Sequence, residues 1–382
     1  MEKKRFLKDN GFLTIVTALL MAMGVFSFFA SDMRYYEKEM RTLVRKPLAR
    51  KADLESGAYV LQYEEYLRDQ SPLRTPMNLG NTQLRRLLGD RYIDDIYLCR
   101  RGKYMSDIKL PDVEQVKREI WEIRLMKTKE KNVTVMLIPD AASVQRHLLP
   151  DGANPAPQEF MMEHVKRLLG ERIFYVDAYE ALAGHCQARI YYDTDPALTS
   201  LGGYYVSAAY LENAGIPPRG VEAYRHGQVT DAFYGAYAHA GGFKKADPEK
   251  IYVFRPKNFA KDVLLKDTSG KVLRTSIYDT KALEGNNKRK VFLGDVPPVV
   301  KIETSAQNTR RLLILKDDAA DVMIPFLIPY YHEIVVADTL RMTESPEALA
   351  DRYKAFDVLF VFDGNRFFSG SALKGKDYAP KE

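Results

Sequence analysis

Two stretches of the sequence place reactive residue types in the loops that follow apolar segments. The first, YYDTDPALTSLGGYY (residues 191–205), has two aspartates, a proline and a Thr-Ser-Leu-Gly-Gly run that leads into an apolar segment. The second, LLILKDDAADVMIPFLIP (residues 312–329), has an apolar run that ends in Lys-Asp-Asp. Many hydrolases place a nucleophilic serine in such a strand-to-helix turn, where a base and helix-terminal N–H groups activate it. Here Asp317 and Asp318 occupy the turn, and the first loop contains neither histidine nor cysteine.

The segments that must position these loops predict a three-layer α/β domain. Continuous apolar runs rich in β-branched residues predict the strands of a parallel sheet that is covered on both faces. These runs are Val133–Pro139, Ile173–Asp177, Arg311–Lys316, Glu333–Asp338 and Val358–Phe362. Amphipathic stretches predict helices at 112–131, 157–169, 200–214, 319–327 and 345–355. The alternation is typical of a doubly wound, mostly parallel sheet, whose sites lie at the carboxyl ends of the strands.

The remaining segments define the predicted domain boundaries. Residues 31–90 are charged at first and then helical (58–68 and 77–88), which indicates a juxtamembrane stalk with helices. Residues 91–382 form the predicted α/β domain. Within it, residues 216–300 are rich in Gly, Lys, Asp and Tyr and fit the alternation less well. We therefore expect an insertion of hairpins and long loops there.

The N-terminal apolar segment predicts a membrane anchor. Residues 11–30 carry no charge, and a helix of this length spans roughly 30 Å, the thickness of the hydrocarbon core of a bilayer. The basic residues of segment 1–10 predict a cytoplasmic tail by the positive-inside rule. A cleaved signal peptide is the alternative, but Phe28 is bulky where a cut after Ala30 favours a small residue. We therefore expect a single-pass protein of the cell membrane, with the rest of the chain extracytoplasmic.

Composition and charge exclude some classes of function. The formal net charge of +6 is small for 382 residues, and the basic residues form no stripe typical of a nucleic-acid-binding surface. Cys99 and Cys186 are the only cysteines. Two cysteines far apart in sequence do not decide between a disulfide and two free thiols, and free thiols are the simpler interpretation. We expect no cofactor.

Six segments resemble, in the same order, segments of a known family. They are LRDQSPLR (67–74), VMLIPDAA (135–142), YYDTDPALTSLGGYY (191–205), FYGAYAHAGG (233–242), VFLGDVPPVVKI (291–302) and LLILKDDAADVMIPFLIPYYHEIVVAD (312–338). The chain resembles the DHHW proteins of Gram-positive bacteria, which are relatives of the SGNH-hydrolase-like alginate O-acetyltransferases. The resemblance implies an SGNH-hydrolase-like fold and a role in the O-acetylation or assembly of cell-surface polysaccharides. It also implies a membrane-bound O-acyltransferase as the partner that delivers the acetyl group.

The positions that the resemblance assigns to catalysis differ in this chain. The family pattern T-D-H-H-W-T-S-L-G reads Thr-Asp-Pro-Ala-Leu-Thr-Ser-Leu-Gly here. Asp195 and Thr199 are kept, whereas the catalytic histidine falls on Ala197 and the tryptophan on Leu198. We expect Thr199 and Ser200 to set the turn into the following helix, with Ser200 as the helix cap.

Two further parts of the expected catalytic apparatus differ as well. The family's Lys-Asp-Ser, which supplies the nucleophile, is replaced by Lys316, Asp317 and Asp318. The family's Gly-Gly-Asn, which suits an oxyanion hole, is replaced by Gly294, Asp295 and Val296.

These differences predict a degenerate site. Ester hydrolysis or acetyl transfer needs an oxygen nucleophile, a base and donors for the oxyanion. Ala197 cannot take a proton, and an ionised Asp318 only accepts hydrogen bonds and opposes a developing oxyanion. The simpler role for Asp318 is to cap N–H groups at a helix N-terminus. We therefore predict a pseudoenzyme that is a carbohydrate-binding or scaffolding component of the polysaccharide machinery.

Two alternatives remain open at this point. The first is an active O-acetyltransferase or acetylesterase with relocated catalytic groups, for which His185 and His239 are candidate bases. The second is a divalent-cation site formed by Asp195, Asp295 and Asp318, because a hard cation neutralises carboxylates that lie together.

Overall fold

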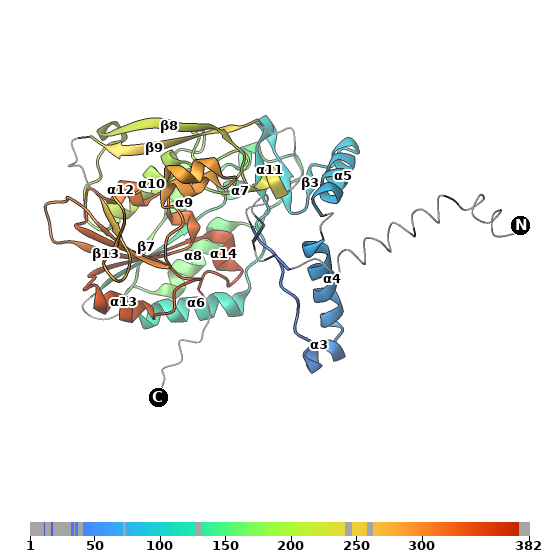
Figure 1. Cartoon of the computed structure of the whole chain (residues 1–382), viewed down its shortest axis with the longest axis horizontal. Helices are drawn as coiled ribbons and strands as arrows, with labels where there is room; N and C mark the ends of the chain where they lie inside the picture. Colours follow the sequence, from blue (N-terminus) through green and yellow to red (C-terminus); the bar gives the residue numbers. More distant parts are fainter. Residues whose placement is uncertain are drawn as a thin grey trace, which may run out of the picture. The chain divides into compact units, whose positions relative to one another are not determined.

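The computed structural model (Figure 1) describes residues 32–33, 35–36, 41–71, 74–126, 131–240, 247–257 and 263–373, together with positions 11 and 17. The chain divides into two compact units, Met1–Gly89 with His239–Lys244 and Asp90–Ala238 with Lys245–Glu382. The predicted anchor at 11–30 lies almost entirely outside the described residues. None of the helices in the described ranges has the length and apolar character needed to cross a membrane.

The first unit contains the helices that the sequence predicts at 58–68 and 77–88. Its elements are β1 (Tyr35–Tyr36), β2 (Arg41–Thr42), α3 (Lys51–Glu55), α4 (Ala58–Gln70) and α5 (Arg74–Leu87). The two short strands pair antiparallel. In the last turn of α4, Asp69 forms a buried ion pair at 3.4 Å with Arg74, the first residue of α5. The Asp69 carboxylate also accepts a hydrogen bond from the backbone N–H of Val44.

An eight-stranded sheet forms the centre of the second unit. Its strands are β6 (Asn132–Ile138), β7 (Phe174–Val176), β10 (Leu264–Lys266), β11 (Val272–Arg274), β12 (Val299–Glu303), β13 (Arg311–Lys316), β14 (Glu333–Asp338) and β15 (Asp357–Asp363). The order is β11-β10-β12-β14-β13-β15-β6-β7. The strands from β14 to β7 are parallel, whereas β12, β10 and β11 extend the β14 edge antiparallel. The predicted mostly parallel sheet is therefore confirmed.

Helices cover both faces of this sheet (Figure 1). One face carries α6 (Val113–Leu125), α8 (Gln158–Leu169), α13 (Pro346–Arg352) and α14 (Gly364–Phe368), and the other carries α7 (Ala141–Val144), α9 (Ala178–Ala183), α10 (Ser200–Asn213) and α12 (Ile324–Leu327). Strand β6 shows why. Val133, Val135 and Leu137 lie in the core with α6 and α8, whereas Met136 and Ile138 lie in the core with α10 and α12. Because successive strand residues point to opposite faces, a continuous apolar strand requires cover on both.

Smaller elements surround the sheet. Strands β3 (Tyr92–Ile93), β4 (Ile96–Leu98) and β5 (Tyr104–Ser106) form a three-stranded sheet, and β8 (Tyr224–Phe233) pairs with β9 (Glu249–Pro256) in a hairpin. A short helix, α11 (Ala236–Ala240), follows β8. The 3-10 turns are η1 (Arg100–Gly102), η2 (Arg146–Leu148), η3 (Val221–Ala223), η4 (Thr280–Glu284), η5 (Lys288–Phe292) and η6 (Asp318–Ala320). The segment 216–300 thus contains the expected hairpin, but β10 and β11 belong to the main sheet.

The prediction of a continuous helix at 319–327 is wrong. The chain instead forms the 3-10 turn η6 and then the single-turn helix α12. Pro325 lies in the first turn of α12. Proline fits only the first turn of a helix, because it lacks an N–H group and its ring clashes with the preceding turn, so α12 begins next to Pro325.

Candidate functional site

The candidate site lies at the carboxyl ends of three neighbouring parallel strands. Asp317 and Asp318 follow β13, Asp363 ends β15, and Asp140 follows β6 shortly after its last residue. The registers of β13 with β15 and of β15 with β6 align these ends. Asp140 and Asp317 are buried. The topology therefore gathers several carboxylates at one edge of the sheet, where doubly wound folds form their sites.

The loop 191–205 contributes a further buried carboxylate, that of Asp195. One of its oxygens accepts a hydrogen bond from the backbone N–H of Ala197 (3.0 Å), and the other accepts one from the N–H of Ala236 (2.9 Å). The same carboxylate lies 3.1 Å from Nε of Arg289, in turn η5. The Asp195 side chain is fully shielded from solvent, so these contacts fix it in one orientation.

Arg289 joins Asp195 to Asp318. Its Nη2 atom lies 3.4 Å from one carboxylate oxygen of Asp318, and the Arg289 side chain is 17 % exposed. The other oxygen of Asp318 lies 3.3 Å from Nη2 of Arg366, whose Nε atom is 3.7 Å from Asp317. These five side chains, which we call the ion-pair network, connect the loop 191–205 to the ends of β13 and β15.

Charge neighbours keep Asp318 ionised. Partial desolvation favours its neutral form, but the guanidinium groups of Arg289 and Arg366 and the ammonium group of Lys316 outweigh this and lower the pKa of Asp318 to about 2. For Asp317, burial is the larger effect and raises the pKa despite the neighbouring Arg366. At neutral pH the position expected for a nucleophilic serine therefore holds a carboxylate anion.

Asp317 has the capping role that the sequence suggests for Asp318. Its Oδ1 atom accepts a hydrogen bond from the N–H of Ala319 (2.9 Å) at the start of η6, and Oδ2 accepts one from the N–H of Asp363 (2.9 Å). The capping role predicted for Asp318 is wrong, because its carboxylate faces the two arginines. The third residue of this segment, Lys316, is buried and pairs with Asp321 at 2.5 Å.

The rest of the predicted histidine motif is part of the packing. Ala197 is partly buried against the hydrophobic core, and Leu198 is buried and forms a β-bridge with Tyr191. Thr199 is the cap of α10, because its hydroxyl accepts a hydrogen bond from the N–H of Gly202. The prediction that Ser200 is the cap is wrong, because its hydroxyl donates to the carbonyl oxygen of Tyr252.

The predicted oxyanion-hole positions lie outside the ion-pair network. Asp295 is 83 % exposed and pairs with Lys290 at 2.7 Å, and Gly294 has a left-handed backbone (φ 78°). Val296 contributes its carbonyl oxygen, which accepts a hydrogen bond from Arg341. No three His, Cys, Asp or Glu side chains within the described ranges form a group that could hold a metal ion.

The candidate bases have other contacts. The ring of His185 stacks on Tyr205 with centroids 3.6 Å apart, and His239 lies in α11. Among the residues that the structure describes, no histidine joins the ion pairs of Asp195, Asp317 or Asp318. Cys99 and Cys186 are free thiols, and burial raises the pKa of the Cys99 thiol to about 12.

A buried clamp holds the loop 191–205. The Glu249 carboxylate accepts hydrogen bonds from the backbone N–H groups of Asp193 (2.7 Å) and Thr194 (2.8 Å), and from the Thr194 hydroxyl (2.6 Å). Lys103, also buried, donates to the carbonyl oxygens of Tyr191 (3.3 Å) and Tyr192 (2.9 Å). Burial raises the pKa of Glu249 and lowers that of Lys103. The contacts fix the backbone that carries Asp195.

The sequence alone did not point to Arg289, Arg366 or Glu249. Arg289 lies in NNKRKVF, where nothing marks one basic residue over its neighbours. Arg366 had a usable signal, because it lies four residues after the predicted strand 358–362, and strand ends carry sites in this class of fold. Glu249 lies in a segment that was expected to be a loop-rich insertion.

The comparisons with known proteins agree with this architecture. The structure is similar to a DHHW family protein from Eubacterium siraeum DSM 15702, with a TM-score of 0.62 and 22 % identity over 72 % of this chain and 94 % of that chain. It is also similar to PatB1 of Bacillus cereus (TM-score 0.59, 18 % identity, 72 % of this chain and 98 % of that chain). A second PatB1 structure, with a sulfonyl adduct, gives a TM-score of 0.58 at 18 % identity over 71 % and 96 % of the two chains. No curated protein matches the sequence.

The family assignment rests on the sequence. The profile of the DHHW protein family matches residues 125–337, which are more than half of the chain. The match begins after the segment 67–74, so it is narrower than the resemblance suggested. It includes the loop 191–205, Arg289 and the end of β13. The chain therefore belongs to the DHHW protein family.

Proposed function

We propose that this DHHW protein is a pseudoenzyme that binds or scaffolds components of cell-surface polysaccharide O-acetylation. The observation that carries the proposal is the position of Arg289, between the buried Asp195 and the half-exposed Asp318. In a hydrolase of this type the aspartate orients a histidine base, which activates a serine. Here the same aspartate pairs with a guanidinium group, which pairs in turn with a second carboxylate.

The chemistry of the ion-pair network supports this proposal. A guanidinium group stays protonated and cannot act as a general base. A carboxylate anion at position 318 is a weak nucleophile toward esters and repels the oxyanion of a tetrahedral intermediate. The guanidinium groups that could stabilise such an oxyanion already face Asp317 and Asp318.

The proposed setting is the outer face of the cell membrane. The apolar segment 11–30, with basic residues before it, supports a single-pass anchor and an extracytoplasmic domain. The family resemblance supports a membrane-bound O-acyltransferase as the partner. With the catalytic positions replaced, the contribution of this chain would be to hold the glycan or the partner in place.

Labelling with a sulfonyl fluoride tests the proposal. PatB1 has been captured with a sulfonyl adduct, so PatB1 serves as the positive control. We expect the full chain in neutral detergent to gain no stoichiometric adduct with phenylmethylsulfonyl fluoride, as measured by intact-mass spectrometry. An adduct that forms with the folded chain but not with the urea-unfolded chain, on a residue of 191–205 or 312–329, would contradict the proposal and favour an active acyltransferase or esterase.

A further inference from the structure

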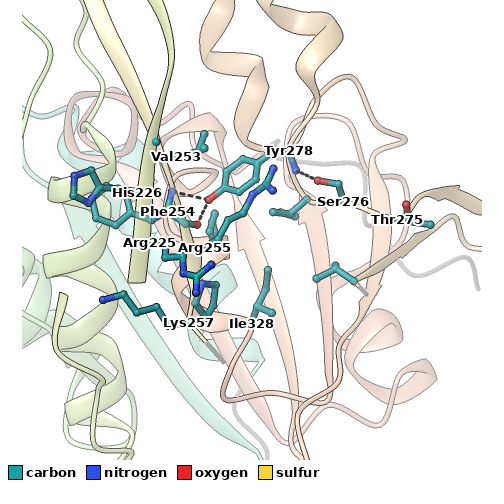
Figure 2. Close-up of a pocket in the computed structure, with 15 residues that line it drawn as sticks. Arg225, His226, Val253, Phe254, Arg255, Lys257, Thr275, Ser276, Tyr278 and Ile328 are labelled. Carbon is teal, nitrogen blue, oxygen red and sulfur yellow. Dashed lines mark hydrogen bonds between the residues drawn. The ribbon is translucent and has the colours of Figure 1, made fainter. Parts of the chain in front are cut away.

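A pocket of about 780 Å³ lies beside the β8–β9 hairpin and shares no lining residue with the ion-pair network. It is lined by both strands of the hairpin, by residues 275–278 and by Pro325 and Ile328 (Figure 2). Its volume falls in the range of about 300–1,000 Å³ that is typical of small-ligand sites. The pocket is therefore separate from the candidate catalytic site, and the proposed loss of catalysis does not explain its role.

The charged side chains that line this pocket are basic. Arg225, Arg255 and Lys257 line it together with His226, and none of its lining residues in the described ranges is Asp or Glu. Arg225, Arg255 and Lys257 are exposed, and none forms an ion pair with any residue that the structure describes. Other arginines of the second unit do form such pairs, as Arg289 and Arg366 do. Within the part of the chain that the structure describes, the pocket thus presents three cations that have no acidic partner.

Two of these cations are held next to each other. Arg225 and Arg255 are directly opposite in the register of β8 and β9, so their side chains leave the same face of the hairpin. Like charges in this arrangement repel and destabilise the pair of strands. The guanidinium group of Arg255 lies over the ring of Tyr278, 5.7 Å from its centroid. The Tyr278 hydroxyl in turn donates to the carbonyl oxygen of Phe254, which fixes the ring (Figure 2).

We propose that this pocket binds a carboxylate or phosphate group of an acidic glycan. Guanidinium groups match the geometry of these oxyanions with paired N–H donors, and a bound anion would offset the repulsion between Arg225 and Arg255. The Thr275 and Ser276 side chains line the same pocket and offer hydroxyl groups for a sugar. The inference names the ligand class for the glycan-binding part of the proposed function and rests on that function.

The shape of the pocket favours a glycan over a membrane surface. Peripheral membrane binding uses apolar side chains that project into the lipid interface. The apolar lining residues here include Val253, Phe254, Ile277 and Ile328, all of which are buried. A concave, cationic surface with a buried apolar floor accepts a ligand that enters it, as a charged sugar unit would.

Calorimetric titration of the full chain in neutral detergent tests the inference. The anionic probes are hexagalacturonate and mannopentaose phosphate, and their neutral counterparts are methyl-esterified hexagalacturonate and mannopentaose. We expect at least one anionic probe to bind and its neutral counterpart to bind at least tenfold more weakly. Arg225→Gln with Arg255→Gln should weaken binding by about tenfold for each arginine removed, since each supplies charge-assisted hydrogen bonds.

A control variant with the same change in net charge is Arg100→Gln with Arg352→Gln. These arginines are about half exposed, pair with Asp151 and Glu344, and do not line the pocket. The control should bind like the unmodified chain. The melting temperature of the pocket variant should equal or exceed that of the unmodified chain, because a repulsive pair is removed.

Three outcomes would overturn the inference: no binding of either anionic probe, equal binding of the neutral probes, or equal weakening by the control variant. Binding of dihexanoyl phosphatidylglycerol alone, lost in the pocket variant, would assign the pocket to lipid headgroups instead. These outcomes leave the sulfonyl labelling result untouched, so a failure of this inference is distinguishable from a failure of the proposed loss of catalysis.

Discussion

Replacing Arg289 with methionine should lower the free energy of unfolding by about 3 kcal/mol, because it leaves the buried carboxylate of Asp195 without a counter-charge. Asp195 would retain only its two backbone N–H donors, from Ala197 and Ala236. Asp318 would lose one of its two guanidinium partners but is half exposed and can be solvated. Urea-induced unfolding of the full chain, followed by circular dichroism, measures this loss.

Two matched variants separate the ion-pair network from general effects of charge. Arg352→Met removes an arginine that is half exposed and pairs with Glu344, and it should cost under about 1 kcal/mol. Arg289→Met combined with Asp195→Asn removes both buried charges, so it should recover most of the loss. A loss below about 1 kcal/mol for Arg289→Met alone would show that Arg289 does not neutralise Asp195 in the folded protein.

Replacing Glu249 with leucine should have a comparable or larger effect on the loop 191–205. The substitution leaves three donors without their acceptor: the partly buried N–H group of Asp193 and the buried N–H and hydroxyl groups of Thr194. Each unsatisfied buried donor costs roughly 1–3 kcal/mol, so the two buried donors of Thr194 alone give an expected loss of about 2–6 kcal/mol. Hydrogen exchange should also show the amides of Asp193 and Thr194 losing protection.

Glu249→Gln is the matched control for this prediction. Glutamine keeps the shape and one acceptor oxygen, so at least one of the N–H groups keeps its partner. We expect a loss about half that of the leucine variant or smaller. Equal effects of the two substitutions would mean that the negative charge of Glu249, which also lies 3.2 Å from Arg189, matters more than its hydrogen bonds.

The sheet was predictable from the sequence because its strands are buried on both faces. A run such as Val133–Pro139 is apolar throughout, and only a parallel sheet between two layers of helices buries every one of its side chains. The helix at 319–327 was not predictable by the same argument. The apolar residues there suit a helix, but Pro325 and the turn made by Asp317 limit the chain to one turn.

The candidate site could be predicted only in part from the sequence. Asp195 and Asp318 could be singled out because motif flanks surround each of them, and the structure places both on one guanidinium group. Arg289 and Glu249 come from distant segments without a motif, and their partners are fixed only by tertiary packing. Asp295 was singled out in the same way, because its segment resembles the family, but it lies outside the ion-pair network and pairs with Lys290.

Turnover of an activated acetyl ester is the most direct test of the central claim, that ion pairs have replaced the catalytic apparatus. The full chain in neutral detergent is incubated with 4-nitrophenyl acetate, with and without a polysaccharide acceptor, beside the Asp195→Asn and Asp318→Ala variants. Removal of a member of a working catalytic triad lowers the rate by several orders of magnitude. We predict that all three proteins release nitrophenol at the same background rate. Turnover by the unmodified chain that either substitution abolishes would contradict the account.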